Sequence, residues 1–219
     1  MKFLYVNAHT RIPIDKISAS DGVTILIGDG YLPPLSLDDE LLGATNFIKS
    51  LCVLSKKKNN LILAGCKLFC GKKTFWGTLV IDCGKFVGIS DMTHSVDSSY
   101  DESNVMRVFD TSIGRLGIVS GDDVHFFEVS RILRLWECDM LVYSLNSPLS
   151  RRHRILIEAQ SMSNGVTAIC ISRDKTCAYG GKNMIPVKGG FHLTPTKSDI
   201  LLNSRKPDTY SEIVKRPTL

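Results

Sequence analysis

The chain has 219 residues, of which 43% are hydrophobic and 22% are charged, and its formal net charge is +5 at pH 7. These values are typical of a folded soluble protein and exclude a collagen-like or intrinsically disordered chain. We expect one domain over residues 1–219, with a polar C-terminal tail after about residue 208.

The composition also argues against several kinds of partner. No apolar run approaches the roughly 20 residues that cross a bilayer, and the N-terminal sequence MKFLYVNAHT lacks the apolar stretch of a signal peptide. We therefore expect a cytoplasmic protein with no membrane partner. The basic residues form short clusters without interleaved aromatic residues, which argues against nucleic-acid binding.

Seven cysteines are present, an odd number, and most of them lie in apolar segments. This pattern is typical of reduced, buried thiols. No CxxC pair occurs, and the spacing of Cys66 and Cys70 has no matching His or Cys pair. We expect neither a bound metal nor a cofactor.

Hydrophobic periodicity predicts alternating strands and helices. Ser36 and Asp39 resemble a capping box before a helix, and Gly165 is a helix stop signal. In chain order, the predicted elements are strands at 2–6 and 23–27, a helix from about 37 to the turn at 56–60, strands at 61–65, 76–81 and 86–90, a strand at 116–120, a helix at 124–137, a strand at 139–145, a helix at 150–164 and a strand at 166–172. Near-continuous apolar strands between helices indicate an α/β fold with covered sheets.

The run GRLGIVSGDDVHFFE, residues 114–128, resembles the signature G-R-[IL]-G-[VI]-x-[IV]-C-Y-D-x-R-F-P-E of the nitrilase (carbon–nitrogen hydrolase) superfamily without a gap. Five further stretches resemble the family in the right order: DGVTILIGDGYLPP, GTLVIDCGKFVGISDMTH, AQSMSNGVTAICISR, YGGKNMIPVKGG and SRKPDTY. The resemblance thus covers nearly the whole chain. It implies a four-layer αββα sandwich.

The resemblance also shows which chemical groups are missing. The family uses a Cys nucleophile, a Glu general base and a Lys that stabilises the charged tetrahedral intermediate. It places these groups at Gly121, Gly30 and Met92 of this chain. Supporting positions also differ from the family's pattern. These are His125 and Phe127 in the first stretch, and Gln160 and Ser163 in the stretch AQSMSNGVTAICISR. The family's long first helix is expected to be reduced.

Several polar residues remain near strand ends that would border the family's active site: Asp29, Asp91, His94, Asp122 and Asp123. They could bind a divalent cation or act as acid and base. Alternatively, Asp123 caps a helix and Asp29 and Asp122 occupy turns, which is the interpretation we favour. Ser120 adjoins the nucleophile position, but strand alternation turns it away from the pocket.

The pocket is either open or filled by neighbours such as Met92, Tyr31 or Phe127, and we favour a filled, apolar site. Our leading hypothesis is therefore a nitrilase-like pseudoenzyme with a binding, regulatory or assembly role. The resemblance implies a homodimer, or a heterodimer with an active relative, through helices 124–137 and 150–164. Two alternatives stay open: an amidohydrolase that uses carboxylate or metal chemistry, and a small-molecule-sensing module.

Overall fold

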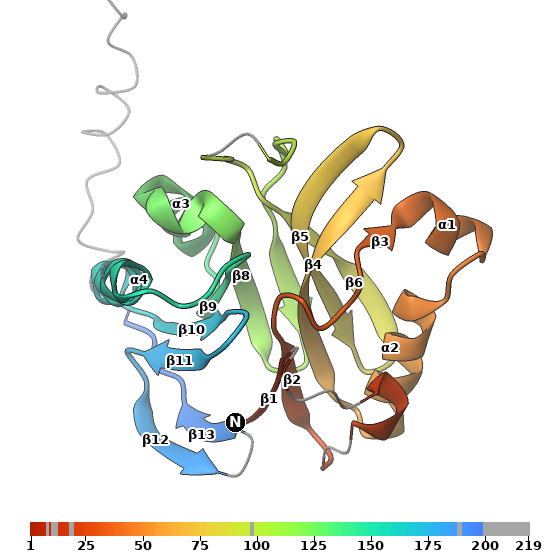
Figure 1. Ribbon diagram of the computed structural model, residues 1–219. Helices are drawn as coiled ribbons and strands as arrows, with labels where there is room; N and C mark the ends of the chain where they lie inside the picture. The colour runs from red at the N-terminus through yellow and green to blue at the C-terminus, as the bar shows by residue number, and fades with distance from the viewer. Residues whose placement is uncertain (8, 10–12, 18–19, 97–98, 188–189, 199–219) are drawn as a thin grey trace, which may run out of the picture.

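A computed structural model describes residues 1–7, 9, 13–17, 20–96, 99–187 and 190–198. Over these residues two sheets pack face to face, and helices cover both outer faces (Figure 1). The larger sheet has the order β12 (Lys182–Val187), β13 (Gly190–Thr194), β1 (Lys2–Val6), β2 (Val23–Ile27), β4 (Leu61–Cys70), β5 (Lys73–Asp82) and β6 (Lys85–Asp91), and the short β3 (Leu35–Ser36) pairs with β4. The smaller sheet has the order β11 (Thr176–Tyr179), β10 (Thr167–Ile171), β9 (Met140–Ser144), β8 (Gly114–Ser120) and β7 (Val108–Thr111).

Three apolar clusters hold the layers together. Between the sheets, Leu26 and Leu63 of the larger sheet share a cluster with Ile118 and Val142 of the smaller one. Because successive side chains of a strand point to opposite faces, the neighbours of these residues face the helices. The outer clusters join the larger sheet to α2 (Phe47–Lys57) and the smaller sheet to α3 (Phe127–Leu135) and α4 (Arg151–Asn164). The predicted αββα sandwich is therefore confirmed.

The predicted strands are present, several with longer extents. The central strands β2, β9 and β10 are buried at every position, which explains their continuous apolar sequences. Parallel pairing joins β1, β2 and β4 in one sheet and β8, β9 and β10 in the other. The antiparallel pair β5–β6 forms a hairpin.

The prediction of a single helix from residue 37 to the turn at 56–60 is wrong. The structure has two helices there, α1 (Leu37–Leu42) and α2, separated at Gly43, which adopts a left-handed φ of 74°. A glycine in that conformation ends a helix. The Glu40 carboxylate then accepts the N–H groups of Phe47 and Ile48, at 2.9 and 3.0 Å, and so caps the start of α2.

The helix predicted at 124–137 is also shorter than expected. A 3-10 turn, η2 (Gly121–His125), comes first, and α3 begins only at Phe127 because Phe126 has extended backbone angles. The helix predicted at 150–164 is confirmed as α4, with Ser150 as its N-cap and Gly165 in the left-handed conformation at its end. These two helices pack against each other on the outer face of the smaller sheet (Figure 1).

Between β1 and β2 the described residues contain one 3-10 turn, η1 (Ile14–Lys16). The polar tail expected after residue 208 lies outside the described residues. Among the helices that the structure describes, none is long and apolar enough to span a membrane.

Candidate functional site

Gly121, the nucleophile position implied by the resemblance, lies at the end of β8 and has a φ of 56°. A Cβ atom on Gly121 would lie 2.5 Å from Sδ of Met92 and 2.9 Å from Cδ1 of Trp76. Met92 is fully buried, and its Sδ also accepts the backbone N–H of Asp122 at 3.1 Å. The Met92 side chain therefore fills the space beside Gly121.

Trp76 closes the same region from the larger sheet. It is buried, and its indole N–H donates to the carbonyl oxygen of Ser144, on β9 of the other sheet, at 3.2 Å. The carbonyl of Trp76 accepts the N–H of Met92 at 2.9 Å. Trp76 thus links the two sheets and fixes the segment that carries Met92.

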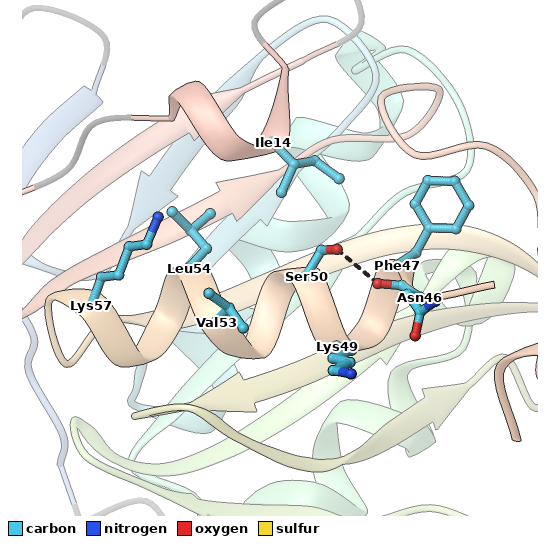
Figure 2. Close-up of a pocket in the computed structure, with 8 residues that line it drawn as sticks. All are labelled: Ile14, Asn46, Phe47, Lys49, Ser50, Val53, Leu54 and Lys57. Carbon is cyan, nitrogen blue, oxygen red and sulfur yellow. Dashed lines mark hydrogen bonds between the residues drawn. The ribbon is translucent and has the colours of Figure 1, made fainter. Parts of the chain in front are cut away.

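A surface groove of about 480 Å³ lies elsewhere, between η1 and α2 on the outer face of the larger sheet (Figure 2). Gly30, Met92 and Gly121 do not line this groove. Its lining residues are Ile14, Asn46, Phe47, Lys49, Ser50, Val53, Leu54 and Lys57.

Gly30, where the resemblance places the general base, follows β2 in a turn with a φ of 77°. The preceding Asp29 pairs with Arg173: one carboxylate oxygen lies 2.7 Å from Nε and 2.6 Å from Nη2 of the guanidinium. Burial raises the pKa of Asp29, and the Arg173 charge opposes this shift. The ion pair joins the loop after β2 to the β10–β11 turn. The charge of the Asp29 carboxylate is therefore balanced by the Arg173 guanidinium.

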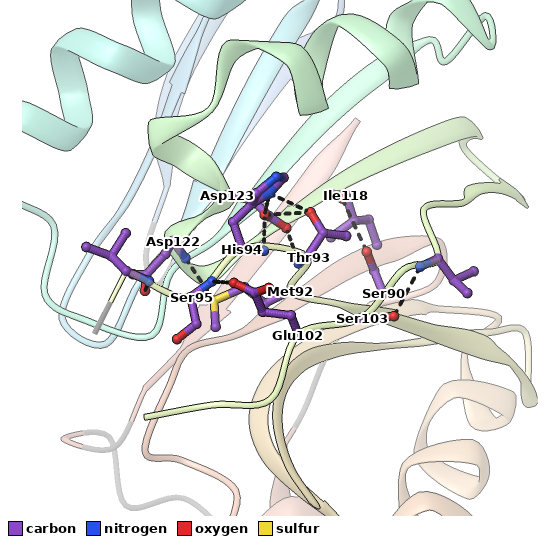
Figure 3. A network of polar contacts seen from close by, with 12 residues as sticks. Ser90, Met92, Thr93, His94, Ser95, Glu102, Ser103, Ile118, Asp122 and Asp123 are labelled. Carbon is purple, nitrogen blue, oxygen red and sulfur yellow. Dashed lines mark hydrogen bonds and ion pairs between the residues drawn. The ribbon is translucent and has the colours of Figure 1, made fainter. Parts of the chain in front are cut away.

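The polar network at the start of η2 centres on Asp123, which is 1% exposed (Figure 3). One carboxylate oxygen accepts the N–H of Thr93 at 2.8 Å, and the other accepts the Thr93 hydroxyl at 2.7 Å and the N–H of His94 at 2.9 Å. The imidazole Nδ1 of His94 also lies 2.9 Å from this second oxygen. Burial raises the pKa of Asp123, and these donors oppose the rise.

The interpretation of Asp123 as a helix cap is therefore wrong. Neither η2 nor α3 receives a side-chain cap, because the Asp123 carboxylate turns toward the segment after β6 instead. Asp122 lies in η2, where it accepts the exposed N–H of Val96 at 3.0 Å. Asp29 does occupy a turn, as expected.

Ser120 lies at the end of β8 with its side chain between the sheets. Its hydroxyl donates to the carbonyl of Ser90 at 2.8 Å and lies 3.3 Å from the hydroxyl of Thr78. The next residue, Gly121, lies against Met92 and Trp76 instead. The alternation of a strand thus separates the Ser120 hydroxyl from the nucleophile position.

The structure brings His94, Asp122 and Asp123 into one network and leaves Asp29 in a separate ion pair (Figure 3). Within the described part of the chain, no group of three or more His, Cys, Asp or Glu residues is arranged to hold a metal ion. The network holds η2 against the segment after β6, which carries Met92.

Two buried residues that sequence reasoning did not single out as site residues lie around this region. Burial raises the pKa of Cys66 on β4 to about 12, and the charges of Asp29 and Asp91 add to the rise. This thiol therefore stays protonated at neutral pH. The second of these residues is Trp76. The sequence around it indicates only a buried strand residue and gives no sign of a role at the site.

Gln160 of α4 supports η2 from the opposite side. Its amide nitrogen donates to the carbonyl of Val124 at 2.8 Å, and its amide oxygen accepts the Tyr143 hydroxyl at 3.1 Å. The resemblance marked Gln160 as a departure from the family's pattern. Its hydrogen bonds show that Gln160 supports the turn that follows β8.

Comparisons with known proteins agree with this architecture. The family model described as carbon–nitrogen hydrolase matches residues 26–187. No curated protein matches the chain. Solved structures similar to it include a carbon–nitrogen hydrolase from Helicobacter pylori, with 16% identity, coverage of 100% of this chain and 98% of that one, and a TM-score of 0.63.

Two further structures are similar at lower coverage. One is a member of branch 10 of the nitrilase superfamily from Saccharomyces cerevisiae, with 13% identity, coverage of 89% of this chain and 82% of that one, and a TM-score of 0.59. The other is an amidase from Nesterenkonia sp., with 12% identity, coverage of 87% and 82%, and a TM-score of 0.59. At these identities the likeness shows the shared fold.

Proposed function

Because this chain belongs to the carbon–nitrogen hydrolase family, we propose that it keeps the family's fold without its hydrolytic chemistry and acts through binding or assembly. The observation that carries the proposal is the contact of Met92 with Gly121. A nucleophile side chain at Gly121 would begin 2.5 Å from Met92 Sδ, so the buried Met92 side chain would have to move to admit it. Met92 stands where the resemblance expects a charge-stabilising Lys, and its thioether side chain fills the site.

The remaining polar groups support the same proposal. Nucleophilic catalysis needs an activated nucleophile within hydrogen-bond reach of a base. Asp29 is paired with Arg173, Asp123 with Thr93 and His94, and the Cys66 thiol has a raised pKa. We also propose a cytoplasmic location, which agrees with the seven free cysteines.

The first test is an assay of ammonia release by the purified full chain with a panel of aliphatic and aromatic amides and nitriles. We expect rates equal to the protein-free control, with and without added Zn²⁺ or Mn²⁺. A protein-dependent rate that disappears in Asp29→Asn or Asp122→Asn would contradict the proposal and favour an amidohydrolase that uses carboxylates. The matched control is Asp21→Asn, because Asp21 is exposed at a turn away from these groups.

We propose that the assembly is a dimer with a second copy of the chain, or with an active relative, through the outer faces of α3 and α4. Large apolar side chains are exposed there: Phe127, Leu135, Trp136, Ile155 and Met162, at 41%, 50%, 46%, 56% and 70%. Ile155 and Met162 are seven residues apart in α4 and so share one face. Large apolar side chains exposed on two packed helices support a protein–protein interface at this face.

Sedimentation of the full chain tests this proposal. We expect a reversible dimer at micromolar concentration and a shift of at least tenfold toward monomer in Met162→Asp, because a buried unpaired carboxylate opposes association. Leu41→Asp is the matched control, since Leu41 is 86% exposed on α1 at the opposite side of the molecule (Figure 1). A monomer at every concentration would contradict the proposed homodimer, and the active relative would then be the partner to test by co-sedimentation.

A further inference from the structure

Two cysteines face each other beneath α4, away from the site described above. Cys170 of β10 and Cys177 of β11 are directly opposite in the antiparallel register. Cys170 is fully buried in the cluster under α3 and α4, whereas Cys177 packs against the edge of that cluster and is partly exposed. One thiol is therefore accessible to solvent, and its partner lies behind it.

The surroundings of the two thiols differ. The Cys170 thiol, the Tyr179 hydroxyl and the charge of Arg154 on α4 all act to lower the pKa of Cys177, and burial opposes them. Tyr179 is two residues along β11 and so shares the face of Cys177. Together these groups hold the pKa of Cys177 below the usual range. The neighbouring Cys177 thiol, burial and the charge of Asp174 raise the pKa of Cys170.

The register also suits a covalent bond between the two sulfur atoms. Directly opposite residues of an antiparallel pair have Cα atoms about 4.5 to 5.5 Å apart. Disulfides span Cα distances of about 4.4 to 6.8 Å. The β10–β11 hairpin can therefore close a disulfide without a change of register.

We propose that Cys177 and Cys170 form a peroxide-reactive dithiol site, in which Cys177 is the attacking thiolate and Cys170 the resolving thiol. The Cys177 sulfur attacks one oxygen of a hydroperoxide, the O–O bond breaks, and the leaving oxygen departs as water or an alcohol after taking up a proton. Cys177 is then a sulfenic acid. The sulfur of Cys170 attacks it, the S–O bond breaks, and the products are water and a Cys170–Cys177 disulfide. The peroxide is reduced by two electrons and the two thiols are oxidised.

Peptide mapping of the reduced full chain after treatment with hydrogen peroxide tests the site. Trypsin cleaves after Arg173 and Lys175, so a disulfide would join two separate peptides. We expect this linked pair as the main oxidation product at low peroxide excess. In Cys170→Ser we expect a Cys177 sulfenic acid that dimedone traps, and in Cys177→Ser we expect loss of the linked pair.

Cys83→Ser is the control that should leave the linked pair unchanged. Cys83 is exposed. Partial desolvation of its thiol and the nearby Asp82 carboxylate raise its pKa, so a smaller fraction of Cys83 than of Cys177 is thiolate at neutral pH. We also expect iodoacetamide to label Cys177 half-maximally below about pH 8.5, the ordinary thiol value. Oxidation that begins at Cys70 or Cys83 without a linked pair, or dimedone labelling absent from Cys177 in Cys170→Ser, would overturn the proposal.

Discussion

Gly121→Ala is expected to lower the free energy of unfolding by about 3 kcal/mol. A non-glycine residue in the left-handed region costs roughly 1 to 2 kcal/mol, and overpacking a filled core costs roughly 1 to 3 kcal/mol. Both costs apply, because Gly121 has a φ of 56° and its Cβ would lie 2.5 Å from Met92 Sδ. Urea denaturation followed by circular dichroism measures the change.

Gly71→Ala separates the two costs. Gly71 has a φ of 57°, and no atom lies within 4 Å of the Cβ position. This control should therefore show the backbone cost alone, about 1 kcal/mol. If Gly121→Ala is no more destabilising than Gly71→Ala, then Met92 moves aside freely, and the site beside Gly121 can accept a side chain.

A double-mutant cycle with Met92→Ala identifies the contact itself. Removing the Met92 side chain leaves a cavity and destabilises the protein on its own. It also makes room for the methyl group that Gly121→Ala adds, so the double variant should be more stable than the sum of the single effects by about 1 to 2 kcal/mol. If the two single effects on the free energy of unfolding simply add in the double variant, then Gly121→Ala destabilises through backbone strain and not through the Met92 contact.

The sequence predicted the layers of this fold well, because each central strand is buried on both faces and so carries an unbroken apolar run. The error at Gly43 has a physical cause. Leu41 and Leu42 continue the apolar spacing of α2, but they are 86% and 83% exposed and belong to a separate helix. Apolar spacing alone cannot distinguish a buried face from an exposed one.

The candidate site was harder to predict, because its contacts join distant segments. The resemblance placed Gly121 and Met92 at the nucleophile and lysine positions, but their contact depends on how β6 and β8 pack across the two sheets. Likewise Asp123 reaches Thr93, thirty residues earlier in the chain. An aspartate before a helix carries a strong local signal for capping, and tertiary partners replaced that role here.

The Asp123 network gives the second large prediction, a loss of about 3 kcal/mol in the free energy of unfolding for Asp123→Asn. The carboxylate accepts two backbone N–H groups and one hydroxyl while 1% exposed. An amide of the same size would turn an NH₂ donor toward one of these donors. Breaking a buried, charge-assisted network costs about 3 to 5 kcal/mol, and the remaining amide oxygen offsets part of this.

Asp122→Asn is the matched control, one residue away in the same 3-10 turn. Its carboxylate accepts the N–H of Val96, which is 64% exposed, so water can replace the lost bond. We expect a change below about 1 kcal/mol for this variant. Urea denaturation of both variants measures the difference.

Hydrogen exchange shows where the Asp123→Asn effect arises. At least one of the amides of Thr93 and His94 should exchange faster in Asp123→Asn by more than the global loss of stability requires, because asparagine retains only one of the two acceptor oxygens. The amide of Val96 should respond only to Asp122→Asn. Equal exchange at Thr93 and His94 in both variants would mean that the segment after β6 is held by the Met92 contact and not by Asp123, and Met92→Ala should then release it.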